Sequence, residues 1–163
     1  MPPNHSIAHE QAIKDTTAHH HLASRPACEF DSDGQQFMDL LAAYRPSGGL
    51  ARADDLLNIF KSRGGPDVSC LARWLVDRKV IGIEWQGATW LPLFQFNRSD
   101  MEPRADLAAV LKELNPVFDA WELAQWFSRP NPSLAGRSPL EELNCNPASI
   151  VAAARADRFI IRG

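Results

Sequence analysis

The sequence has few of the residues that build disulfide frameworks, zinc sites or membrane spans. Its three cysteines, Cys28, Cys70 and Cys145, are widely separated and include no C-x-x-C pair, which fits reduced thiols better than a cross-linked or zinc-bound domain. No eighteen apolar residues occur together, and the N-terminus lacks a basic region followed by an apolar run. We therefore expect a cytoplasmic protein that makes no contact with a membrane.

Catalytic signatures are also missing. There is no glycine-rich phosphate loop, no H-E-x-x-H and no G-x-S-x-G. All five histidines lie within the first 21 residues, where His5 and His9 have helical ligand spacing but no ordered neighbours to orient them. Carboxylates elsewhere would form an acid–base pair only by a spatial coincidence that the sequence does not show. The expectation is a protein that is not an enzyme and holds neither a metal ion nor a cofactor.

Positive charge is not in excess. The 17 Lys and Arg residues face 20 Asp and Glu residues, which gives a formal net charge of -3, so contact with nucleic acid would require a local basic patch. What the chain does have is length and apolar content: 163 residues that are 45% hydrophobic can bury a core. That size fits one medium domain or two small lobes that share an interface.

Three segments follow from the pattern along the chain. Residues 1–34 are polar and contain few large apolar residues, which predicts a mobile arm. Residues 35–99 predict three short helices: one from Gln35 to about 45, one at about 51–62 and one near 67–78. Alternating apolar residues over 81–96, interrupted by Gln86-Gly87, predict a β-hairpin, and Pro92 favours an edge or bulged position in it.

Helices followed by a hairpin also occur in that order in winged-helix modules, which bind DNA. Basic residues in and after the third predicted helix are the candidates for phosphate contacts: Arg73, Arg78 and Lys79. The alternative is a solvated helix face, because Leu71, Trp74 and Leu75 occupy much of the same helix. A DNA-binding transcriptional regulator is therefore the second functional hypothesis.

Residues 100–163 predict a C-terminal helical lobe. Pro103 suits the first turn of a helix with apolar residues at helical spacing, and Pro116 restarts the chain. The next helix, about 117–128, is apolar around more than half of its circumference, so it is either central to the core or offers one side to a partner. We expect the core of this lobe to contain Trp121, Leu123, Trp126, Phe127, Leu134 and Leu143.

An elaborate corner follows that helix. Pro130 disfavours helical geometry at the residue before it, and Leu134 is the only large apolar residue in the loop. Gly136 permits a positive φ, and Ser138-Pro139-Leu140-Glu141 matches a capping box with proline at the first helical position. Asn146-Pro147 repeats this start signal for a last helix, which leads into a terminal segment rich in arginine and apolar residues.

The run WFSRPNPSLAGRSPLEEL, with the final helix after it, resembles the C-terminal toxin-binding domain of the Xre/MbcA/ParS group of bacterial antitoxins. The resemblance covers about residues 105–163. The positions that match the pattern of the family, in order, are Trp126, Phe127, Pro130, Asn131, Leu134, Gly136, Pro139 and Leu143.

This resemblance implies an all-helical, oligomerising domain that neutralises a RES-type toxin, an NAD-consuming enzyme, by placing its C-terminal segment at the active-site cleft. The implied toxin-binding residues here are Arg155, Arg158, Phe159, Ile160, Ile161 and Arg162. Arginines and apolar side chains suit such a contact, although the same arginines would also complement the helix dipole of a frayed terminus. The leading hypothesis is an antitoxin-like protein with a mainly α fold: N-terminal helices with a hairpin in winged-helix-like order, then the helical lobe.

Overall fold

The computed structural model describes residues 27–163. Helix α1 spans Ala27–Tyr44, so it begins eight residues before the start that we expected at Gln35. The segment predicted as an arm, 1–34, therefore includes helical residues from Ala27 onward. The rest of that segment, with all five histidines, lies outside the described residues.

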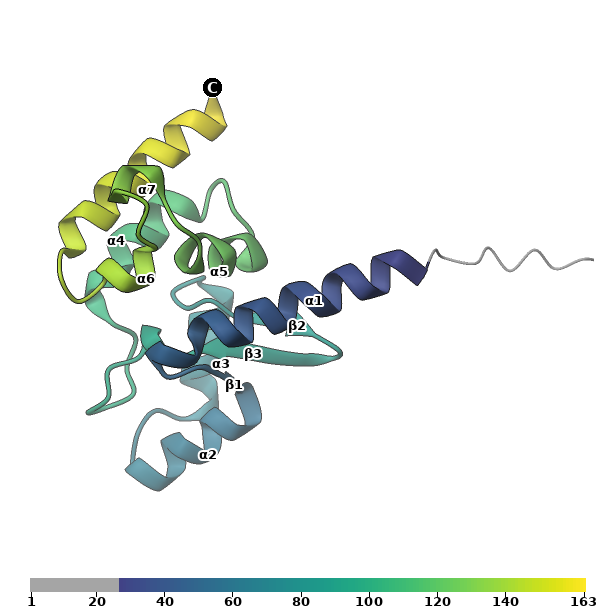
Figure 1. The fold of residues 1–163 in the computed structure, drawn as a ribbon. Coiled ribbons are helices and arrows are strands. Elements are labelled where there is room, and N and C mark those ends of the chain that lie inside the picture. Colours follow the sequence, from purple (N-terminus) through teal and green to yellow (C-terminus); the bar gives the residue numbers. More distant parts are fainter. Residues whose placement is uncertain (1–26) are drawn as a thin grey trace, which may run out of the picture.

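A small antiparallel sheet organises the first half of the described chain (Figure 1). After α1 and a 3-10 turn at Arg45–Ser47 come β1 (Leu50–Arg52), α2 (Ala53–Arg63) and α3 (Val68–Val76). The strands β2 (Ile83–Trp85) and β3 (Ala88–Pro92) follow, and the strand order is β1-β3-β2. This succession of elements is the winged-helix-like order expected from the sequence.

The predicted hairpin is confirmed, and its turn explains its register. Gln86 and Gly87 both have positive φ, 47° and 74°, as a two-residue type I′ turn requires. Trp85 therefore pairs with Ala88, and Ile83 pairs with Trp90. The expected edge position of Pro92 is wrong: β3 is the central strand, and Pro92 is its last residue, opposite Leu50 of the unpredicted strand β1.

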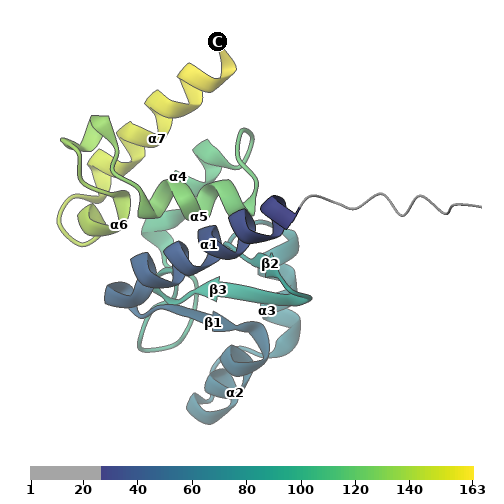
Figure 2. The same ribbon diagram turned by 45° about the vertical axis from the view of Figure 1, so that its right-hand side comes forward.

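The two faces of the sheet are covered by different helices, as Figure 2 shows. Trp90 packs with Ile83 against the larger apolar core, together with α1 and the C-terminal helices. Leu91, the next residue along β3, points to the opposite face and joins a second core built on α2 and α3, which includes Leu56 and Phe60. Helix α1 therefore lies on the side of the sheet opposite α2 and α3.

The second half is helical, so the mainly α fold with a small sheet is confirmed. It contains α4 (Ala105–Leu114), α5 (Ala120–Ser128), α6 (Pro139–Glu142) and α7 (Pro147–Arg162), with a 3-10 turn at Pro132–Leu134. Another 3-10 turn, at Leu93–Gln95, lies near the end of the first half. Pro103 does not lie in the first turn of α4 as expected; it bridges Phe96, and α4 begins two residues later. Within residues 27–163, no helix combines the length and apolarity that crossing a membrane requires.

The predicted core of the C-terminal lobe is confirmed for five residues. Leu123, Trp126, Phe127, Leu134 and Leu143 are buried, whereas Trp121 is half-buried and packs against their edge. The same core also takes in Leu40, Tyr44, Ile81, Ile83 and Phe94 from the first half. The two segments predicted as 35–99 and 100–163 therefore share one apolar core.

Candidate interaction surface

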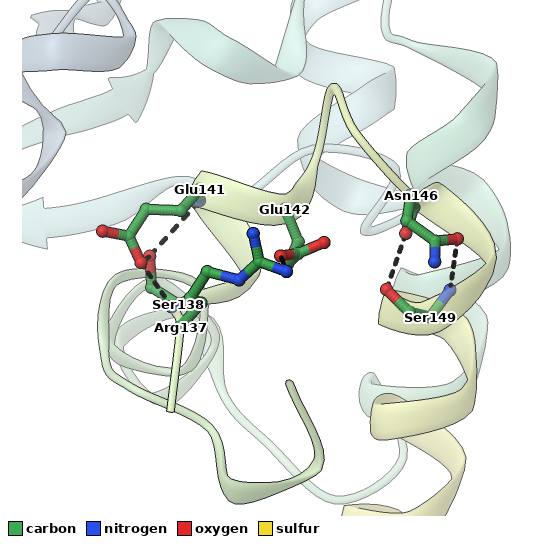
Figure 3. Close-up of polar contacts among 6 residues, drawn as sticks. All are labelled: Arg137, Ser138, Glu141, Glu142, Asn146 and Ser149. Atoms are coloured by element: carbon green, nitrogen blue, oxygen red, sulfur yellow. Dashed lines mark hydrogen bonds and ion pairs between the residues drawn. The ribbon is translucent and has the colours of Figure 1, made fainter. Parts of the chain in front are cut away.

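The start of α7 is fixed by local hydrogen bonds that the sequence predicts (Figure 3). The side chain of Asn146 accepts a hydrogen bond from the Ser149 N–H at 3.3 Å, and the Ser149 hydroxyl donates to the Asn146 carbonyl at 2.7 Å. Pro147 occupies the first helical position, where no N–H is needed. Upstream, Ser138 and Glu141 form the expected capping box of α6.

The corner between α5 and α6 adopts the geometry that its glycine suggested. Gly136 has φ +79°, which confirms the predicted left-handed backbone, and Ala135 before it is also left-handed at +56°. Leu134 is buried in the main core, and Asn131 is buried beside it. Buried Glu142 meets the guanidinium of Arg137 across this corner (Figure 3).

Asp157 joins this corner to the last helix. Its Oδ2 accepts hydrogen bonds from the Trp126 Nε1–H and from the Asn131 Nδ2–H, each at 2.7 Å. Both donors belong to the motif that carried the family resemblance, but Asp157 itself was not among the predicted site residues. The corner therefore positions α7, because one carboxylate on α7 satisfies a donor from α5 and a donor from the loop.

A second contact holds α7 against α4. Arg155 Nε donates to Glu113 Oε1 at 3.0 Å, and Arg158 Nη1 donates to Glu113 Oε2 at 2.6 Å. The hydrogen bond from Arg155, together with the charge of Arg158, lowers the pKa of the Glu113 carboxyl. Two of the predicted toxin-binding arginines are therefore already engaged within the protein, and they fix the direction of the helix.

The C-terminal end of α7 extends away from the rest of the molecule (Figure 1). The terminal segment that we expected after the last helix is part of that helix, since α7 continues through Arg162. Phe159, Ile160 and Ile161 are 78%, 72% and 49% exposed, and Arg162 is exposed next to them. We call these four residues the α7 tip. It presents apolar side chains around the helix rather than along one stripe, because consecutive residues are separated by about 100°.

The candidate DNA-binding residues do not form one free basic face. Arg73 is exposed on α3, but Arg78 points its guanidinium into the carbonyl groups of Asn115 and Phe118, at 2.6 and 2.5 Å. Lys79 lies 3.5 Å from the Asp77 carboxylate. Of the three, Arg78 therefore ties α3 to the loop before α5 instead of facing solvent.

No cluster of metal-ligating side chains occurs in the described part of the chain. Two of the three thiols lie where their exposure is described: Cys70 is half-buried and free, and Cys145 is exposed and free. Neither thiol has a histidine partner among the described residues, because all five histidines lie in residues 1–21.

Comparison of the chain with family models, with curated proteins and with solved structures found no match. Function is therefore inferred from the α7 tip and its anchoring.

Proposed function

We propose that the protein is an antitoxin-like, non-catalytic protein that binds and neutralises a partner through the α7 tip. One observation carries the proposal: Phe159, Ile160 and Ile161 are exposed at the free end of a helix that Asp157 and Glu113 hold in place. Exposed apolar side chains that lie together on a soluble protein mark interaction sites. Here they also stand clear of the fold, where a partner can surround them.

The chemistry of the tip suits insertion of a helix into an apolar groove. Burial of a large apolar side chain contributes about 1.5–3 kcal/mol, so Phe159 and the two isoleucines supply a substantial part of a binding free energy. The helix is formed before binding, which reduces the entropy lost on association. Arg162 adds a charge that favours an acidic rim on the partner.

The identity of the partner rests on the family resemblance alone. It names a RES-type, NAD-consuming toxin whose active-site cleft receives the C-terminal segment of the antitoxin. The α7 tip suits such a plug because its apolar side chains and Arg162 are exposed at the end of the helix. It would enter the cleft as a helix, with Arg155 and Arg158 held back at Glu113 to set its direction.

A co-expression experiment tests this proposal. The reading frame beside the gene is expressed with the wild-type protein, with the double variant Phe159→Asp/Ile160→Asp, and with the control Val76→Asp. Val76 is 83% exposed on α3, so its replacement adds an acidic group to an apolar surface position outside the tip. We expect the wild type and the control to restore growth and to co-purify with the neighbouring product.

The double variant should lose both properties while its circular dichroism spectrum stays that of the wild type. Full neutralisation by the double variant would contradict the proposal, because the tip would then be dispensable. Failure of the wild-type protein to co-purify with the neighbouring product would contradict the choice of partner.

DNA binding is the second candidate, and the winged-helix-like order with strand order β1-β3-β2 supports it. The exposed face of α3 includes Val68, Ala72 and Val76 besides Arg73, which is a poor surface for phosphate contacts. A low-salt mobility-shift assay with promoter DNA distinguishes this candidate. Binding that is abolished by Arg73→Glu/Lys79→Glu would establish it.

A further inference from the structure

A groove with a volume of about 1250 Å³ separates the end of α2 from α6. Ile59 and Arg63 of α2 line one side of the groove, and Leu140 of α6 and Leu143, which follows α6, line the other. The segment from Phe94 to Asp106 contributes several side chains between them. Apolar groups from both cores reach it, since Phe94 and Leu143 belong to the larger core and Phe96 to the smaller. The groove is therefore built where the two apolar cores meet.

The loop that forms one wall of the groove is held in place by several contacts. The Asn97 N–H donates to the Glu102 carbonyl at 2.8 Å, and the Met101 N–H donates to the Asn97 carbonyl at 3.0 Å. Arg63 Nη1 donates to the Arg98 carbonyl at 3.0 Å, which fastens the loop to α2. Met101 has φ +59°, a backbone conformation that non-glycine residues seldom adopt and that often marks functional segments. The wall is thus preformed.

The charged side chains that line the groove are mainly positive. They are Arg63, Arg98, Arg104 and Asp106, so three positive groups face one negative group in a chain whose formal net charge is -3. Asp106 neutralises Arg104 through two hydrogen bonds, at 3.0 and 2.6 Å. Arg98 is exposed and forms no ion pair within residues 27–163. Asp100 and Glu102 of the same loop do not line the groove.

We propose that this groove binds an extended acidic segment of a partner protein, with carboxylates at Arg63 and Arg98 and apolar side chains against the partly exposed Ile59, Leu93 and Leu140. Charge complementarity selects the acidic ligand. A volume of about 1250 Å³ exceeds the roughly 300–1,000 Å³ of small-molecule pockets, which favours a stretch of polypeptide over a single metabolite. The preformed wall lowers the cost of binding because the loop need not be ordered by its ligand.

The groove is separate from the α7 tip. Asn144 lines the groove three residues before α7 begins, and the tip lies at the other end of this helix of 16 residues. At 1.5 Å per residue the helix is about 24 Å long. One small contact patch cannot include both sites, so the groove constitutes a second binding surface that does not depend on the proposed neutralising function.

Selection from a displayed library of random twelve-residue peptides tests the groove, with the full-length protein as bait. The enriched peptides should carry Asp or Glu together with Leu, Ile or Phe. A synthetic peptide from the enriched set should bind at least ten-fold more weakly to Arg98→Glu and to Arg63→Glu/Arg98→Glu. The single variant is needed because Arg63 also fastens the loop.

The matched control for Arg63→Glu/Arg98→Glu is Lys61→Glu/Arg73→Glu. It changes the net charge by the same amount as that double variant, at exposed positions outside the groove. Its affinity for the peptide should equal that of the wild type, and so should the affinity of the tip variant Phe159→Asp/Ile160→Asp. Three results would each overturn the proposal: no enrichment of any peptide, enrichment of peptides without acidic residues, or equal weakening in the control. Because the tip variant is measured in parallel, loss of the groove and loss of the neutralising site are distinguishable.

Discussion

At the scale of single residues, the side chain of Gln95 supplies two hydrogen bonds that strand pairing would otherwise provide. The hairpin register pairs Ile83 with Trp90, and its continuation places Ile81 opposite Pro92, which has no N–H to donate. The buried side chain of Gln95 makes both bonds instead. It accepts from the Ile81 N–H at 2.7 Å and donates to the Ile81 carbonyl at 2.9 Å. The amide of one side chain therefore allows proline to end the central strand.

Replacing Gln95 with Met should destabilise the fold by about 2–4 kcal/mol. The side chain keeps a similar volume, but both backbone groups of Ile81 lose their partners in a buried position, and each such loss costs about 1–3 kcal/mol. Urea denaturation measures the effect. The control Gln35→Met alters an exposed glutamine whose side chain donates to Asp39 Oδ1, and we expect a change within about 0.5 kcal/mol. Equal midpoints for the two variants would contradict this role of Gln95.

The sequence predicted residue roles where the interaction is local and missed them where it is not. The capping residues Ser138 and Asn146 bond to groups three positions away, so a short motif contains the whole interaction. Gln95, Tyr44 and Asp157 act on partners 14 to 80 positions away. Nothing in the neighbouring residues indicates those contacts, because they depend on which elements pack together.

At the scale of elements, one carboxylate of α4, that of Glu113, helps to fix the direction of α7. The hydrogen bond from Arg155, aided by the charge of Arg158, lowers the pKa of Glu113 below its ordinary value of 4.5. A carboxyl whose pKa is lowered on folding contributes stability that is present above the unfolded pKa and is lost as pH falls through the folded one. The contact between α4 and α7 should therefore weaken on acidification below about pH 4.5.

The variant Glu113→Gln tests this pH dependence. At pH 7 it should have a lower melting temperature than the wild type, because the neutral amide cannot pair with two arginines. The difference should shrink below about pH 4.5 and vanish once Glu113 of the wild type is protonated. Thermal unfolding between pH 7 and pH 2 measures it, with Glu102→Gln as an exposed control outside any ion pair within residues 27–163. A difference that stays constant with pH would show that charge at Glu113 is irrelevant.

Element type was predictable where apolar periodicity extends over several turns, as in α4 and α5, and the Gln86-Gly87 turn fixed the hairpin. Strand β1 was missed because three residues are too few to show alternation. Its partner β3 lies about forty residues away, so the pairing that makes it a strand is not local. Because β1 pairs with β3, β3 is the central strand, and Pro92 ends a central strand instead of lying at the edge of the sheet.

At the scale of the whole molecule, the two halves share an apolar core and several hydrogen bonds. Tyr44 of α1 is fully buried and donates a hydrogen bond to the Ala124 carbonyl of α5 at 2.7 Å, and burial raises the pKa of this phenol far above its ordinary value. The Arg78 backbone, left-handed at φ +52°, accepts from Asn115 while its guanidinium donates to the loop before α5. Polar contacts and apolar packing therefore both cross the junction between the halves.

This shared core predicts that residues 100–163 do not fold alone, although the family resemblance is confined to that region. Without the first half, the lobe loses Leu40, Tyr44, Ile81, Ile83 and Phe94, and the apolar faces of α4 and α5 that they cover would be exposed to water. A fragment of this size is already marginal for independent stability. We expect narrow amide dispersion in its heteronuclear NMR spectrum and no cooperative melt, whereas the full chain unfolds in one transition. A dispersed spectrum with a sharp melt would show instead that the lobe is autonomous, and only then would binding studies of the α7 tip on the fragment report on the native surface.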